Sequence, residues 1–193
     1  MLPALNVLAG YLFGSIPFGV LLARWRAGVD VRAQGSGNIG ATNVARVAGK
    51  RLGAVVLGLD AGKAALPVFA ALRLWPDSPW LHAAVAVSAF LGHVFPPWLK
   101  FRGGKGVATA LGGLLVLVPE AALAGGLAYI LVVGAWKKSS LGSLVGGVLA
   151  VVMAFLTGRS RPYAYLAALL FGLILFTHRG NIRRLWRRTE RSF

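Results

Sequence analysis

Apolar stretches separated by short basic or glycine-rich segments run through almost the whole chain. They cover residues 2–23, 52–72, 81–99, 107–118, 121–136, 141–157 and 163–177. A perpendicular membrane helix needs about 20 apolar residues, so the shorter stretches require tilt or a locally thin bilayer. The pattern predicts an all-α, polytopic membrane protein with about seven transmembrane helices, several of them short, in a single domain over residues 1–193.

The distribution of basic residues decides how residues 107–136 are divided. This segment could form one overlong helix or two short ones that turn at Pro119 and Glu120. With two helices, nearly all of the 21 lysines and arginines fall in loops on one side of the membrane, whereas with one they divide almost evenly. Because basic loops are cytoplasmic, we predict two helices here, the N-terminus outside, and the C-terminus in the cytoplasm of a cell (inner) membrane protein.

Small residues and proline predict two local features of the helices. The patterns Gly10-x-x-x-Gly14 and Gly142-x-x-x-Gly146 are typical of closely packed membrane helices. Pro17 predicts a kink in the first helix because proline lacks a backbone donor. That first apolar run has no basic n-region and no cleavage site, so we expect it to be retained as a span.

The composition agrees with lipid as the main solvent, since 57% of the residues are hydrophobic and only 13% are charged. The formal net charge of +16 predicts anionic partners, namely lipid head groups, phosphate-bearing substrates or nucleic acid. Nucleic acid is disfavoured because the cations lie between apolar spans and no aromatic binding platform accompanies them. The absence of cysteine excludes disulfides, zinc thiolates and cysteine nucleophiles, and we expect neither a metal nor a cofactor.

A glycine-rich polar segment, residues 35–46, follows the first apolar stretch. Glycines allow positive φ angles, so successive backbone N–H groups there can point at one anion. Short polar side chains add donors, and an arginine adds a planar fork for phosphate. The glycine spacing, with Asp60 further along, also fits a dinucleotide-binding fingerprint, but that motif requires a preceding strand and a βαβ unit. The candidate phosphate-binding residues are Gly35, Ser36, Gly37, Asn38, Gly40, Thr42, Asn43 and Arg46.

A second glycine-rich segment, residues 92–106, precedes the fourth apolar stretch. Its end, Gly103, Gly104, Lys105 and Gly106, suits close backbone approach to phosphate beside an ammonium group. It is not a Walker A motif, because glycine rather than Ser or Thr follows the lysine. The alternative is a flexible basic anchor at the cytoplasmic face.

Further polar residues flank the last two apolar stretches. Ser140 and Ser143 lie at a helix start, where they could cap the helix or present hydroxyls to a ligand. His178 and Asn181 are three residues apart, so a continuing helix would place both on one face. The terminal arginines assigned to anionic lipid are Arg187, Arg188 and Arg191.

Asp60 and Lys63 lie on one face of the second apolar stretch, at membrane depth. Charges at that depth are costly unless they are paired. We favour an internal ion pair that supports the site. The alternative is a direct role in substrate binding or proton transfer.

In this order, these segments resemble the acyl-phosphate-dependent glycerol-3-phosphate acyltransferase (PlsY) family over nearly the whole chain. The resemblance implies transfer of a fatty acyl group from acyl phosphate to the 1-hydroxyl of sn-glycerol 3-phosphate, giving lysophosphatidic acid and inorganic phosphate. It also implies a seven-helix fold and no need for acyl carrier protein or coenzyme A. The matching pieces are residues 11–19, 35–43 with Arg46, Asp60 with Lys63, Gly92 with His93, 101–109, Ser140 with Ser143, and His178, Arg179, Asn181, Ile182, Arg184 and Leu185.

The resemblance and the residue chemistry together assign catalytic roles. We expect the basic and glycine-rich loops to hold the two phosphates and the donor, and the serine, histidine and asparagine near the last helices to orient the acceptor. All should meet in one pocket at the cytoplasmic face. The residues predicted to act in catalysis are Ser36, Arg46, Lys105, Ser143, His178 and Asn181.

The sequence offers few candidates for a general base. It has no His-x-x-x-x-Asp dyad, and the carboxylates in its predicted cytoplasmic loops are Asp30 and Glu190. Acyl phosphate is already activated, so we expect catalysis by positioning and charge stabilisation, with the acyl phosphate's own oxygen taking the hydroxyl proton. The rival hypothesis is His178 as general base.

Two other classes of function would also explain a small basic membrane protein. A small anion transporter or channel would line its bundle with polar residues from side to side, whereas here they cluster at one interface. A non-catalytic scaffold for anionic lipid would leave residues 35–43 and 103–106 without a purpose. The enzyme is therefore preferred.

Overall fold

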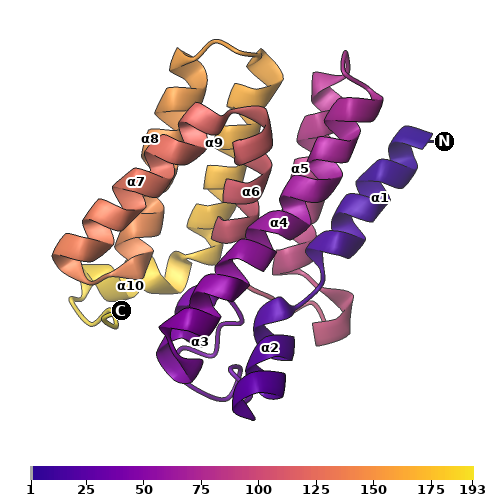
Figure 1. The fold of residues 1–193 in the computed structure, drawn as a ribbon. Helices are drawn as coiled ribbons and strands as arrows, with labels where there is room; N and C mark the ends of the chain where they lie inside the picture. The colour runs from indigo at the N-terminus through magenta and orange to yellow at the C-terminus, as the bar shows by residue number, and fades with distance from the viewer. Residues whose placement is uncertain (1) are drawn as a thin grey trace. The chain divides into compact units, whose positions relative to one another are not determined.

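The computed structural model describes residues 2–193, and these residues form helices without any β-strand (Figure 1). They divide into two compact units, of which the first ends at Gly113 and the second covers Leu114–Phe193. The all-α prediction is confirmed for the described residues. That the chain forms a single domain over residues 1–193 stays a prediction.

The first unit is assembled on one long apolar helix, α4 (Lys50–Leu74). Helix α4 contacts α1, α2, α3 and α5, and α1 also packs along α5. The other elements of this unit are α1 (Leu2–Gly14), α2 (Phe18–Ala27), α3 (Ala41–Ala48), α5 (Pro79–Val94), a short 3-10 helix (Pro97–Leu99) and the beginning of α6 (Val107–Leu117).

The first apolar stretch breaks at the predicted proline. Helix α1 ends at Gly14 and α2 begins at Phe18, directly after Pro17. Proline has no N–H to donate to the preceding turn, so the helix cannot run through this point undisturbed. The predicted kink is confirmed as a full break. The two helices together make a candidate span of 26 residues, Leu2–Ala27.

Glycines bring the backbones of α1 and α5 into direct contact. A Cβ atom at Gly14 would collide with the backbone of Ala89, and one at Gly92 would collide with the Tyr11 carbonyl oxygen. Gly10 lies equally close to α5. The prediction that the Gly10-x-x-x-Gly14 pattern serves close helix packing is confirmed.

The second unit begins with the end of α6. Helix α6 stops at Leu117 and α7 starts at Pro119, so the prediction of two helices within residues 107–136 is confirmed. Helix α8 packs against α7 and α9, and α10 contacts α8 and α9. A Cβ atom at Gly125 would lie only 2.7 Å from the Gly146 carbonyl oxygen, which confirms close packing at the second glycine pattern. The remaining elements are α7 (Pro119–Trp136), α8 (Ser139–Leu156), α9 (Arg161–Thr177) and α10 (Arg179–Trp186).

Among the described residues, four helical segments are long and apolar enough to cross a membrane, and a fifth results if the bent pair α9 and α10 counts as one span. Helix α6 is apolar but shorter. Tryptophans at helix ends are exposed, as is common where a membrane helix meets the water interface. They are Trp25, Trp80, Trp136 and Trp186. The count of about seven spans and the orientation of the termini stay predictions.

The close approach of α1 and α5 generates a stability prediction. In Gly92→Ala the new methyl group overlaps the Tyr11 carbonyl oxygen, so the two helices must move apart. Such overpacking costs about 1–3 kcal/mol, and a chain of this size loses about 2–4 °C of Tm per kcal/mol. We expect Tm in detergent to be lower by at least about 2 °C. Gly126→Ala, where the methyl group meets open space, is the control, and equal Tm values for both variants would contradict the packing.

Candidate active site

The first loop, residues 28–40, is built around the buried side chain of Asn43. Asn43 Oδ1 accepts a hydrogen bond from the Ser36 N–H at 2.8 Å, while Nδ2 donates to the carbonyls of Val31 at 2.9 Å and Gln34 at 3.1 Å. Gly35 is required because a Cβ atom there would collide with Asn43 Oδ1. Asn43 therefore shapes the loop with both ends of its amide. Its contact with phosphate stays a prediction.

The glycines of this loop have different conformations. Gly35 (φ +61°) and Gly37 (φ +72°) lie in the left-handed region, as their use for an anion-binding turn requires. Gly40 does not, with φ −77°, and its N–H is bonded to Asn38 Oδ1 at 2.8 Å just before α3. Gly40 is the N-cap of α3, where an extended backbone conformation is usual. Substrate contacts of Gly35, Gly37, Asn38 and Gly40 stay predictions.

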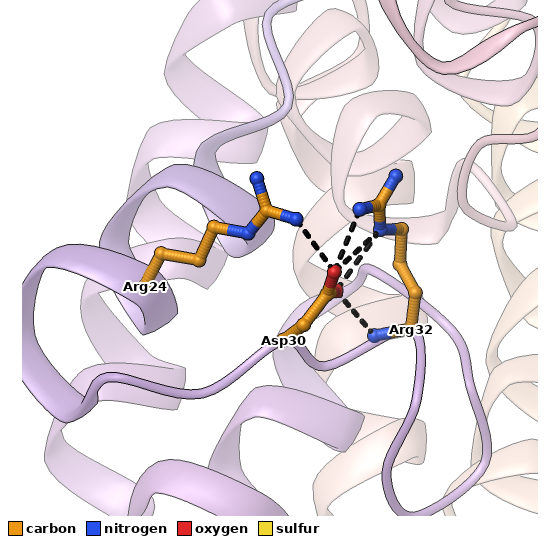
Figure 2. Close-up of polar contacts among 3 residues, drawn as sticks. All are labelled: Arg24, Asp30 and Arg32. Carbon is orange, nitrogen blue, oxygen red and sulfur yellow. Dashed lines mark hydrogen bonds and ion pairs between the residues drawn. The ribbon is translucent and has the colours of Figure 1, made fainter.

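Two arginines hold the start of the loop through one carboxylate, as Figure 2 shows. Asp30 Oδ2 lies 2.7 Å from Arg24 Nη2, at the end of α2, and 2.6 Å from Arg32 Nη2. The Arg32 side chain, its backbone N–H and then Arg24 hold the pKa of Asp30 well below its usual range. A carboxylate so stabilised is a poor proton acceptor. Asp30 is thus a structural group of this loop and not a general base.

Three predicted residues of this region lie on or near α3. Ser36 is exposed in the loop, Arg46 is exposed on α3, and Thr42 is half-buried in the first turn of that helix. The bond from the Ser36 backbone to Asn43 ties the loop to α3. Substrate binding by Ser36, Thr42 and Arg46 stays a prediction.

The glycines of the second loop pack against the end of α5. The Gly103 N–H donates to the Val94 carbonyl at 2.9 Å, and the Gly104 N–H donates to the His93 carbonyl at 3.0 Å. Cβ atoms at either glycine would collide with residue 93. Both N–H groups therefore already donate to carbonyls of α5. The sequence predicted that glycines here let backbone amides approach phosphate, but in this structure these two amides bond within the protein.

The lysine of this loop stands just before a helix. Lys105 is half-buried and α6 begins at Val107, so the ammonium group and the positive end of the helix lie in the same region. Gly106 has φ +81°, and a Cβ atom there would collide with the ring of Phe90. Phosphate binding by Lys105, Gly103, Gly104 and Gly106 stays a prediction.

A buried charged cluster lies within the membrane part of the first unit. Lys63 Nζ is 2.8 Å from each of three acceptors, Asp60 Oδ1, His93 Nδ1 and the Ile16 carbonyl oxygen. The Asp60 and Lys63 side chains are each 2% exposed. The two charged groups are within ion-pair distance, but the geometry of the contact is not that of a hydrogen bond. Asp60 Oδ1 accepts no hydrogen bond from any described residue. Sequence reasoning proposed the ion pair but missed His93, whose only signal was its place in the family resemblance.

In the second unit, a carboxylate joins two of the predicted residues. Glu190 Oε1 accepts hydrogen bonds from Ser140 Oγ at 2.8 Å and Asn181 Nδ2 at 2.6 Å, and Oε2 lies 2.8 Å from Arg184 Nε. Ser143 Oγ instead donates to the Ser139 carbonyl one turn earlier, at 3.0 Å. Sequence reasoning considered Glu190 only as a candidate general base and missed these contacts, because nothing local relates it to Ser140, 50 residues earlier.

The charge of Glu190 follows from these donors. Burial alone raises the pKa of its carboxyl, but hydrogen bonds from Asn181, Ser140 and Arg184 outweigh burial and bring the pKa below its usual value. Glu190 is therefore ionised at neutral pH. It fixes the rotamer of Asn181 and is too strongly stabilised to serve as a general base.

His178 lies at a bend and not within a continuing helix. Helices α9 and α10 meet there at 65°, and the His178 side chain is buried. Its Nδ1 lies 2.9 Å from the Ile174 carbonyl oxygen, which can only accept, so Nδ1 carries the proton and the neutral ring has its lone pair on Nε2. His178 and Asn181 still share the first turn of α10. That all predicted residues share one pocket stays a prediction.

Comparison with known proteins identifies the family. The family model described as glycerol-3-phosphate acyltransferase matches residues 4–188. The chain belongs to the glycerol-3-phosphate acyltransferase family. A family member from Myxococcus xanthus (strain DK1622) is 67% identical over 187 residues, which cover 97% of each chain. One from Anaeromyxobacter sp. (strain K) is 53% identical over 197 residues, which cover all of this chain and 98% of the relative.

Two solved structures of a family member have the same fold. They are crystal structures of PlsY, described as an integral membrane glycerol 3-phosphate acyltransferase, in a glycerol 3-phosphate form and a lysophosphatidic acid form. Their TM-scores to this chain are 0.95 and 0.92, at 36% and 34% identity, and each match covers all of this chain and 96% of the other. The family predicted from the sequence is confirmed, and with its apolar helices the chain is a multi-pass membrane protein.

The Glu190 carboxylate yields a pH prediction. Because its pKa is lowered on folding, its stabilising contribution is present above the usual value of 4.5 and is lost as pH falls through the folded pKa. We expect Glu190→Gln to lower Tm at pH 7. We also expect its Tm to fall less steeply than that of the wild type as the pH is lowered. The control is Glu120→Gln, which removes a solvent-exposed pair with Arg159 in the same unit. Indistinguishable curves for the two variants would contradict the buried role of Glu190.

Proposed function

We propose that the protein transfers a fatty acyl group to the 1-hydroxyl of sn-glycerol 3-phosphate and forms lysophosphatidic acid. The proposed donor is acyl phosphate, so inorganic phosphate is the second product, and neither acyl carrier protein nor coenzyme A takes part. The observation that carries the proposal is the match to a family named for this acyltransferase over residues 4–188, with related structures in substrate and product forms.

The chemistry of the first unit supports a reaction between two phosphate-bearing molecules. Lys105 stands at the positive end of α6, and two glycines of the first loop have the left-handed conformation found in anion-binding turns. Arg46 adds a second exposed cation with a planar fork. We assign Lys105 and Arg46 to the phosphates, and Ser36 with its loop to the acyl donor.

The state of the carboxylates supports catalysis without a carboxylate base. Asp30 is held by two guanidinium groups, and Glu190 by three donors. Acyl phosphate is a mixed anhydride with a good leaving group, so holding the hydroxyl against the carbonyl carbon and stabilising the developing charge is sufficient. The hydroxyl oxygen forms a bond to the carbonyl carbon, the bond to the phosphate oxygen breaks, and the proton leaves with phosphate.

The second unit is assigned to the acceptor. His178 has its lone pair on Nε2, which suits it to accept a hydrogen bond from a substrate hydroxyl. Asn181 is oriented by Glu190, and Ser143 lies one turn into α8. We assign these three residues to glycerol 3-phosphate. General-base catalysis by His178 is the rival role for the same geometry.

The proposed placement is in the cell (inner) membrane with about seven spans, the N-terminus outside, the C-terminus cytoplasmic and the active site at the cytoplasmic face. The support is the concentration of cations in the segments that would face the cytoplasm, together with the exposed tryptophans at helix ends. Terminal arginines such as Arg187, Arg188 and Arg191 would contact anionic lipid heads.

One assay tests the proposed function against the alternative of a small anion transporter or channel. Purified protein in detergent micelles is given acyl phosphate and glycerol 3-phosphate, and phosphate and lysophosphatidic acid are measured. We expect equimolar products, none without glycerol 3-phosphate, and none with acyl coenzyme A as donor. A transporter forms no product in micelles, so the absence of lysophosphatidic acid would refute the enzyme.

Lys105 provides the sharpest mutational test of the phosphate assignment. Removing a charge that stabilises the transition state typically lowers kcat by about 10²–10³-fold, and Lys105→Ala should retain almost no activity while remaining folded in detergent. Arg102→Ala, which removes an exposed cation from the same loop, should lose far less. Retention of most activity in Lys105→Ala would refute its role.

His178→Ala separates orientation from base catalysis. If His178 orients the acceptor, the variant raises KM for glycerol 3-phosphate and leaves kcat nearly intact. If it is the base, kcat alone falls by about 10²–10⁴-fold. We expect the first result from steady-state kinetics at saturating acyl phosphate.

A further inference from the structure

We propose that the buried cluster of Asp60, Lys63 and His93 positions the two loops of the first unit relative to each other, and that His93 is the positioning residue for Lys105. This inference rests on the proposed function, because it concerns how the phosphate-holding lysine is placed.

Lys63 donates to a carbonyl at the break after α1. In a continuous helix the Ile16 carbonyl would accept from the Val20 N–H, but that group donates to Pro17 at 3.0 Å, and Ile16 accepts from the Phe18 N–H at 3.1 Å instead. Lys63 Nζ reaches the Ile16 oxygen at 2.8 Å and lies 5.8 Å from the ring centre of Phe18. The ammonium group is a second donor to this carbonyl, in a part of the chain where lipid offers none. It therefore ties α4 to the turn from which α2 begins.

The position of α2 in turn fixes the first loop. A Cβ atom at Gly19, in the first turn of α2, would collide with the Ile39 carbonyl oxygen, so the loop backbone lies directly on this helix. Ile39 is itself buried, as part of the apolar cluster that α2 forms with the loop and α3. Moving the start of α2 would carry this loop with it.

His93 links the same ammonium group to the second loop. Lys63 donates to Nδ1, so the neutral ring carries its proton on Nε2. The Nε2 side lies against Gly104, where a Cβ atom would collide with Nε2 and come within 2.8 Å of Cε1. The adjoining Gly104 N–H is bonded to the His93 carbonyl. The ring and backbone of His93 together set the path of the chain that leads into Lys105.

The cluster is suited to positioning rather than to contact with substrate. The side chains of Asp60, Lys63 and His93 are 2%, 2% and 4% exposed, so none of them faces solvent. Polar contacts in a buried site are costly to break, so they hold the joined chain segments in one relative position. Beyond the second loop, a Cβ atom at Gly112 of α6 would collide with the Ala61 carbonyl, so α6 also rests on α4 beside the cluster.

An exchange of side-chain sizes tests the His93–Gly104 contact: alanine enlarges position 104, and asparagine then shortens position 93. Gly104→Ala places a methyl group on the imidazole, displaces the loop and should lower kcat/KM by at least about tenfold. His93→Asn keeps an acceptor for Lys63 at the Nδ1 position but removes the two ring atoms nearest the new methyl group. We expect His93→Asn/Gly104→Ala to have at least about fivefold higher kcat/KM than Gly104→Ala alone.

The control for a glycine-to-alanine change is Gly58→Ala, on exposed surface of α4, where the methyl group meets open space. It should have wild-type kinetics. Unchanged activity in Gly104→Ala, or a double variant no better than the product of the two single effects, would overturn the proposal. If the double variant does not fold, the kinetics of the single variant His93→Asn test the proposal. It must raise KM for the same substrate as Lys105→Arg, and an unchanged KM would overturn the proposal.

The wild-type assay separates this inference from the proposed function. If wild-type protein forms no lysophosphatidic acid, the proposed function fails and kinetics of the variants have no meaning. If the wild type is active but the size exchange restores nothing, the positioning role of His93 fails while the function stands.

Discussion

The first unit depends on one constraint, the need of a buried ammonium group for acceptors within the membrane. Lys63 has three, supplied by Asp60 on its own helix, His93 on α5 and the broken end of α1. Removing any one would leave the buried ammonium group with fewer acceptors where lipid supplies none. Three parts of the chain are therefore held at a single point, and the second glycine-rich loop begins near it.

Several loop glycines have a packing role that their sequence pattern does not reveal. Gly104 and Gly106 are required because α5 side chains occupy the space that a Cβ atom would need, and Gly35 is required by Asn43. The amides of Gly103 and Gly104 are bonded to α5. Phosphate binding by Lys105, Arg46 and the start of α6 stays a prediction, whereas the packing of the backbone against α5 that these glycines allow is seen in the structure.

Local patterns in the sequence predicted the features that depend on neighbouring residues. Pro17 predicted a kink, which is a full break in the structure, and charge distribution predicted two helices around Pro119. Glycine spacing predicted close helix packing, and the structure shows which helices meet, α1 with α5 and α7 with α8. The candidate site residues come from residue chemistry together with the resemblance to a family, and they stay predictions. The helix count was less predictable, because α5 and α6, with 16 and 11 residues, are shorter than a perpendicular span needs.

Features that depend on distant residues were missed. His93 lies 30 residues from Lys63, and Glu190 lies 50 from Ser140. No periodicity links such pairs, since the fold alone brings them together. A glycine-rich run also does not reveal which glycine precedes the next helix, as Gly40 does here. The carboxylate of Glu190 is the clearest example, since its donors come from two separate helices, α8 and α10.

The hydrogen bond from Lys63 to His93 is the contact that tests this description most directly. Nitrogen NMR of histidine-labelled protein in detergent would report the tautomer, with His93→Asn used to assign the signal among three histidines. The structure predicts a neutral ring with the proton on Nε2 and an accepting Nδ1, and loss of this signature in Lys63→Met. A proton on Nδ1, or an imidazolium at neutral pH, would contradict it.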